Sequence, residues 1–109
     1  MQVVVSQAYT LDAGEHADEY VRLSGEFTAF MRRHPGFLGR RLLRSLEDPT
    51  HFTHVRLFDS IASYEELTEM AGYHERIAEM AVHVHQPAGG PPREYFEVAV
   101  DEDPLPPAA

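Results

Sequence analysis

A histidine and an arginine alternate with phenylalanines in the segment HFTHVRLF, residues 51–58. Successive side chains of an extended strand point to opposite faces, so Phe52, His54, Arg56 and Phe58 share one face. An imidazole and a guanidinium on an aromatic face are costly unless each finds a hydrogen-bond partner. Because histidine ordinarily titrates near neutral pH, we predict that His54 acts as a general base on an acidic phenol or enol. Arg56 would then hold the resulting enolate or a carbonyl oxygen.

The same two side chains also allow a purely structural interpretation. Arg56 could form a salt bridge with a glutamate such as Glu97, and His54 could bond a backbone group. Either arrangement would satisfy the buried polar atoms without any substrate. The sequence leaves both interpretations open.

A further set of aromatic and apolar side chains is predicted to surround the reacting molecule. Tyr64 could bind a substrate oxygen through its phenol, although an aromatic residue at helical spacing from Leu67 also fits an ordinary core. Tyr73 and His74 open the last helix, where they could lie at a cavity mouth or simply be exposed. The predicted apolar lining of an aromatic-ligand pocket, in addition to Phe52 and Phe58, is Phe27, Phe30, Met31, Met70, Ile77 and Met80.

Other kinds of site find little support. His83 and His85 have the spacing of metal ligands on a strand, but they sit at a helix end with no third ligand near them in sequence. The chain has no cysteine, and therefore no thiolate site or disulfide. It has no glycine-rich nucleotide loop and no Ser-His-Asp pattern with a nucleophile elbow. We therefore predict no metal and no cofactor.

Charge limits the partners. Eighteen acidic residues against nine basic ones give a net charge of −9 over 109 residues. This balance argues against nucleic acid and against an anionic membrane surface. There is no run of about 18 apolar residues that could cross a membrane. Residues 1–5 lack the basic start of a signal peptide, so a cytoplasmic location is predicted.

The elements that must position these residues alternate along the chain. Strands are predicted over 2–9, 37–46, 51–58 and 93–100 from β-branched and alternating patterns. A first helix begins after Asp12, which with Glu15 resembles a capping box, and ends near Arg33. Asp59 and Ser60 cap a second helix that runs to about Ala71. Beyond Gly72, a further short helix is predicted over 73–82 and a loop over 86–92.

The order β-α-β-β-α-β predicts an α+β, ferredoxin-like antiparallel sheet with its helices on one face. Residues 1–100 form one domain, and residues 101–109 form an acidic, proline-rich tail. The other sheet face still carries apolar residues in the first and third strands. Because a single copy would leave that face in water, we predict a homodimer.

Two segments resemble the antibiotic biosynthesis monooxygenase family. Residues 34–49, HPGFLGRRLLRSLEDP, resemble its turn and second strand, and residues 52–64, FTHVRLFDSIASY, resemble its third strand and next helix. The resemblance spans roughly residues 2–100. It implies a dimeric α+β barrel in which two sheets pack face to face and each subunit has a cavity between sheet and helices.

The resemblance also implies several chemistries. Some branches oxidise anthrone-like polyketide intermediates with dioxygen and no cofactor; others oxidise quinols or degrade haem, and related barrels are polyketide cyclases. Where the anthrone-oxidising branch has Asn, Trp and Tyr, this chain has His54, Phe58 and Tyr64. The haem-degrading branch needs a histidine where Ile77 and Ala78 stand, which counts against that activity.

The resulting hypothesis is a cofactor-independent oxygenase of an aromatic polyketide-like molecule, with dioxygen as co-substrate. His54 is its general base, and Arg56 and Tyr64 stabilise the oxyanion. An aldol-type polyketide cyclase would use the same groups. A dimer that binds a small molecule without turnover is the third possibility.

Overall fold

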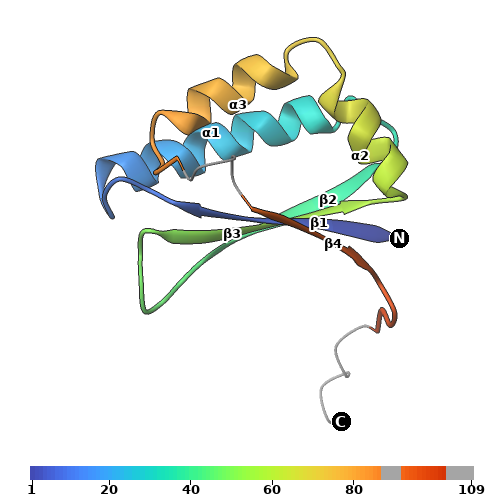
Figure 1. The fold of residues 1–109 in the computed structure, drawn as a ribbon, viewed down its shortest axis with the longest axis horizontal. Coiled ribbons are helices and arrows are strands. Elements are labelled where there is room, and N and C mark those ends of the chain that lie inside the picture. The colour runs from blue at the N-terminus through green and yellow to red at the C-terminus, as the bar shows by residue number, and fades with distance from the viewer. Residues whose placement is uncertain (87–91, 103–109) are drawn as a thin grey trace, which may run out of the picture.

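Four antiparallel strands form one sheet, and three helices lie on one of its faces (Figure 1). The computed structural model describes residues 1–86 and 92–102, and these counts refer to that part. The strands are β1 (Gln2–Tyr9), β2 (Phe37–Arg44), β3 (His51–Phe58) and β4 (Arg93–Glu97), in the spatial order β2-β3-β1-β4. The helices are α1 (Glu15–Met31), α2 (Ile61–Thr68) and α3 (Tyr73–Ala81). The α+β, ferredoxin-like fold class is thus confirmed.

The starts of α1 and α2 differ in how they are capped. The N-cap residue of α1 is Gly14, so the predicted capping box of Asp12 and Glu15 is not formed. The Asp12 carboxylate instead lies just before the helix and accepts hydrogen bonds from the amides of Gly14 and His16, at 3.0 and 2.9 Å. Ser60 caps α2, as predicted, by accepting the amide of Ser63.

Three elements are shorter than predicted. β2 ends at Arg44 instead of residue 46, because the Ser45 hydroxyl accepts two amides of the following turn. The second helix ends at Thr68 instead of Ala71; tighter bonds to carbonyls three residues back close it. β4 ends at Glu97 instead of residue 100, and all five of its residues are exposed at the sheet edge. The predicted loop over 86–92 lies largely outside the described residues, as does the tail from residue 103.

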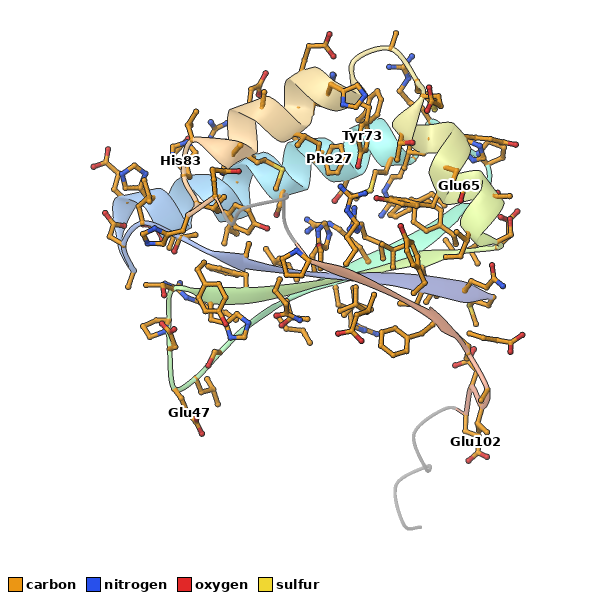
Figure 2. The ribbon with its side chains drawn as sticks, in the orientation of Figure 1. Phe27, Glu47, Glu65, Tyr73, His83 and Glu102 are labelled. Atoms are coloured by element: carbon orange, nitrogen blue, oxygen red, sulfur yellow. The ribbon has the colours of Figure 1, made fainter. Side chains whose placement is uncertain are left out.

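The core lies between the sheet and the helices. Its fully buried members come from every layer: Val4 from β1, Phe52 and Phe58 from β3, and Leu67 from α2. Aromatic rings join the layers, for example Phe27 of α1 with Tyr73 of α3 at a centroid distance of 5.6 Å (Figure 2).

The opposite sheet face has no helix over it within the described residues (Figure 1). Val3, Val5, Val55 and Leu57 lie there in register on neighbouring strands, and Phe96 of β4 extends the row with 48% of its surface exposed. The apolar character predicted for this face is therefore present. No helix of the described part is long and apolar enough to span a membrane.

Candidate active site

The predicted alternation along β3 is confirmed. Phe52, His54, Arg56 and Phe58 are 1, 5, 4 and 0% exposed, whereas the residues between them are half-buried on the other face. The pairing with β1 places Ser6 directly opposite His54 and Val4 opposite Arg56. A histidine and an arginine therefore lie under the helices, two residues apart on a central strand.

These two side chains line a cavity of about 610 Å³ between the sheet and helices α1 and α3. Its sheet wall is polar, with Ser6, His54, Arg56 and the edge-strand Arg93. Its helix wall is mostly apolar. The main contributors from the helices and the segment after α3 are Tyr20, Phe27, Tyr73, Ile77, Met80, Ala81 and Val84. The volume falls in the range of pockets for drug-sized ligands, about 300–1,000 Å³.

His54 is held in its neutral form. Burial lowers the pKa of His54 far below its ordinary value of 6.5, and the positive charges of Arg56 and Arg40 lower it further. The Nε2 atom of His54 is buried and has no hydrogen-bond partner among the described residues. An uncharged imidazole therefore lines the cavity, with its Nε2 atom buried in the wall.

Arg56 is a buried cation without a described carboxylate partner. Its Nη2 donates to the Ser6 hydroxyl at 3.1 Å, and its Cζ lies 5.4 Å from the centre of the Tyr64 ring. Its Nε is buried and has no partner. The structural alternative, a salt bridge with Glu97, is wrong: Glu97 is exposed at the end of β4, and no ion pair of Arg56 exists in the described part. His54 also makes no described backbone bond.

Tyr64 sits behind the cavity wall. Its ring is 2% exposed and packs edge-on against Phe58, with 5.5 Å between centroids. Its hydroxyl accepts a hydrogen bond from Arg93 Nη1 at 2.8 Å. Burial raises the pKa of Tyr64, and the electrostatic effect of Tyr73 raises it further. Among the described residues, the hydrogen bond of Tyr64 to the cavity lining is the one from Arg93.

The structure brings together only part of the predicted lining. Phe27, Tyr73, Ile77 and Met80 line the cavity with His54 and Arg56. Four of the other predicted lining residues, Phe30, Met31, Phe52 and Phe58, are buried in the core. Met70 is half-buried against that core, and His74 is exposed at the start of α3.

Several polar residues of the site were not predicted. Tyr20 lines the cavity, and burial raises the pKa of its phenol. Arg40 of β2 lies opposite Arg56 and donates to Ser24 of α1 at 3.2 Å. Ser6 and Arg93 also line the cavity, as do Gln7, Thr50 and Gln86. The sequence offered one sign of this polar wall: Ser6 interrupts the run of valines in β1.

His83 does not pair with His85. Its Nδ1 lies 2.9 Å from Nδ1 of His16, which is in the first turn of α1. Figure 2 shows His83 just beyond the end of α3, and His85 lines the cavity. The described residues contain no group of three side chains suited to hold a metal ion.

A ferredoxin-like sheet whose buried imidazole and guanidinium face an apolar cavity defines a class of small-molecule-binding α+β domain. The sequence model of the family described as antibiotic biosynthesis monooxygenase matches residues 3–79. The chain belongs to that family and is therefore a monooxygenase-type enzyme. No curated protein matches the sequence.

Solved structures share the fold at low sequence identity. SnoaB of Streptomyces nogalater, a cofactor-independent oxygenase, superposes with a TM-score of 0.75 at 15% identity, covering 96% of each chain. A putative antibiotic biosynthesis monooxygenase from Nitrosomonas europaea gives 0.76 at 17% identity, covering 92% of this chain and all of its own. One from Deinococcus radiodurans gives 0.76 at 16%, covering 97% of this chain and all of its own. At these identities the likeness shows the fold alone.

Proposed function

We propose that the protein is a cofactor-independent oxygenase of an aromatic, polyketide-like small molecule. One observation carries the proposal: in a chain of this family, His54 and Arg56, each with a buried nitrogen that has no described partner, line a cavity with a mostly apolar helix wall. SnoaB, which shares the fold, is described as a cofactor-independent oxygenase. A polyketide-derived substrate and dioxygen are therefore the partners that we propose.

The proposed reaction converts a doubly activated CH₂ group into a carbonyl. His54 accepts a proton from the substrate, and Arg56 stabilises the oxyanion that results. Tyr64 supports this stabilisation from behind the wall, where its ring lies under Arg56 and its hydroxyl accepts a hydrogen bond from Arg93. The electron-rich anion passes one electron to dioxygen, and the two radicals combine into a peroxide. Loss of water from the peroxide leaves the carbonyl, so one oxygen atom enters the product and the other leaves as water with two substrate hydrogens.

The neutral state of His54 suits this role only when the anion is nearby. In the empty site, a proton on His54 is disfavoured mainly by burial and further by the positive charges of Arg56 and Arg40. An oxyanion against Arg56 offsets that charge and makes the protonated imidazole tolerable. Proton transfer and anion stabilisation are thus one coupled event, in a cavity whose apolar helix wall strengthens both interactions.

The test compares aerobic with anaerobic turnover of an anthrone. We expect oxygen uptake matched to quinone formation by the wild type, and a fall in kcat of about 10²- to 10⁴-fold in His54→Ala. His51→Ala is the matched control, because His51 lies on the same strand but on the opposite face, bonded to Gln7. Wild-type turnover without oxygen consumption would remove the oxygenase proposal.

An aldol-type cyclase is the second candidate. A base beside a buried cation can enolise a polyketide chain as well as an anthrone, and Phe58 offers a wall without the indole N–H of the oxidising branch. Anaerobic ring closure of a linear polyketide, lost in His54→Ala, would favour this activity. If His54→Ala changes binding but no reaction, the protein is a non-catalytic binding dimer.

The assembly and location that we propose follow from surface character. A second copy would cover the apolar sheet face of Val3, Val55, Leu57 and Phe96. The homodimer and the cytoplasmic location stay predictions.

A further inference from the structure

The charged side chains that line the described part of the cavity are all positive. They are Arg56 and Arg93, and no aspartate or glutamate is among the described lining residues. Arg40 lies just behind this wall, opposite Arg56 on β2. The whole chain has twice as many acidic as basic residues. A cavity free of carboxylates is therefore a local departure from the composition of the molecule.

The buried cation at the cavity floor has no counter-ion in the described part of the chain. Arg56 is 4% exposed and its Nε has no acceptor, although its Nη2 bonds Ser6. An uncompensated buried charge is strongly unfavourable, and buried charges in proteins are generally paired. The neighbouring His54 Nε2 is likewise buried without a partner. Both atoms belong to residues that line the same cavity.

The spacing of the two residues suits a planar oxyanion. Residues two apart on one strand lie about 6.6 Å apart at their Cα atoms and point the same way. A guanidinium Nε–H and a neutral imidazole N–H can then donate to two oxygens of one anionic group, or to one oxygen together. Opposite them, Phe27, Ile77 and Met80 form an apolar wall that fits a flat hydrocarbon body.

We propose that the ligand of this cavity is an aromatic anion, whose carboxylate, phenolate or enolate oxygens bind at the wall that Arg56 and His54 line. This inference rests on the proposed function and names the substrate class of the same site. It adds that the anion is present in the bound ligand rather than only in a transient state of the reaction. Burial is the main cause of the lowered pKa of His54, and the positive charges of Arg56 and Arg40 lower it further. These two charges also favour an anion at this wall.

The first experiment needs only the wild-type protein. Calorimetric titration at pH 7.5 compares 2-naphthoate with its uncharged analogue 2-naphthalenemethanol, which has the same rings. We expect naphthoate to bind about 10- to 100-fold more tightly, the range typical of a hydrogen-bonded charge. Equal affinity, preference for the alcohol, or no binding of either compound counts against the carboxylate.

A second arm tests the phenolate. The absorbance of 2-naphthol is titrated with alkali, free and with the protein in excess. Binding as the anion lowers the pKa of the naphthol. A carboxylate preference alone identifies a carboxylic acid ligand, and a lowered naphthol pKa alone identifies an acidic phenol or enol. Failure of both arms overturns the proposal.

Variants assign the effect to Arg56. Arg56→Met should abolish the preference for the anion and leave the affinity for the alcohol nearly unchanged. Arg22→Met is the matched control, because it changes the net charge equally while Arg22 lies exposed on α1, paired with Glu19 and Glu26. An anion preference that survives in Arg56→Met overturns the assignment. If that variant does not fold, Arg56→Lys, which keeps the charge but loses the Nε donor, should weaken naphthoate binding.

These outcomes separate the two proposals. Anion binding without oxygen uptake on any anthrone would leave this inference standing and remove the oxygenase. Oxygen uptake with no preference for an anion would do the reverse.

Discussion

The most direct test of the site's electrostatics is the pH dependence of folding stability at His54. Its folded pKa lies far below 6.5 because burial and the charges of Arg56 and Arg40 oppose protonation. An unfolded chain binds the proton near pH 6.5, so unfolding takes up a proton at lower pH. The stability that neutral His54 contributes is therefore fully present above pH 6.5 and is lost as the pH falls toward the folded pKa. Tyr20 is the other titratable side chain whose pKa responds to these two arginines.

The size of the effect follows from the pH interval. Each pH unit between the folded pKa and 6.5 lowers the unfolding free energy by about 1.4 kcal/mol. At pH 4.5, two units below 6.5, the wild type has therefore lost about 2.7 kcal/mol of unfolding free energy. Urea unfolding at pH 7.5 and 4.5 measures this loss, at a fixed protein concentration because of the predicted dimer. The comparison variant is His54→Asn, which cannot titrate in this range. Both proteins share every carboxylate, so the difference between their pH dependences isolates His54.

We expect the wild type to lose about 2.7 kcal/mol more than His54→Asn across this interval. Parallel pH dependences would mean that His54 takes up its proton while folded. The argument that two arginines keep the imidazole neutral, and favour an anion beside it, would then be refuted.

Three further outcomes are expected. Gly36→Ala should lower the unfolding free energy by about 1–3 kcal/mol, because the new Cβ would overlap the Ser63 side chain. Gly25→Ala has open space around it inside α1, so it should raise the unfolding free energy by about 0.5–1 kcal/mol in the same urea experiments. Tyr64→Phe should leave Arg93 without its hydrogen-bond acceptor, which should lower the unfolding free energy by about 1 kcal/mol, and should also lower kcat of the anthrone reaction. An unchanged kcat would remove Tyr64 from oxyanion stabilisation. Phe96→Asp should convert a dimer to a monomer in sedimentation velocity, and a wild type that is already monomeric at micromolar concentration would contradict the covered sheet face.

Local patterns predicted the elements well where a single rule determines them. Alternation along residues 51–58 identified the buried face of β3, because no bulge or glycine interrupts that strand. The pattern failed on β2. There a bulge at Gly39, whose φ is +153°, places both Phe37 and Arg40 opposite inward-facing residues of β3 although they are three apart. Arg40 was missed for that reason.

The cavity lining depends on distances between elements, which sequence spacing does not contain. Phe27 and Phe30 lie one helical turn apart on α1, yet Phe27 lines the cavity and Phe30 packs into the core. Arg93 became part of the site only because edge strand β4 pairs with β1, which places Arg93 beside Ser6 and within reach of Tyr64. Both placements depend on tertiary packing, which the local sequence pattern does not reveal.

The pKa of His54 determines what the pH profile of catalysis should report. In the empty site, burial and the charges of Arg56 and Arg40 oppose a proton on His54, so His54 stays neutral throughout the ordinary pH range. Titration of free His54 then cannot produce a limb in kcat/KM near pH 6.5. If the bound species is an anion, the limb instead follows ionisation of the substrate, and it should move when the acidity of the substrate is changed. His54→Ala should lower the plateau of that profile without moving its limb, which distinguishes a base that acts beside a bound anion from one that titrates on its own.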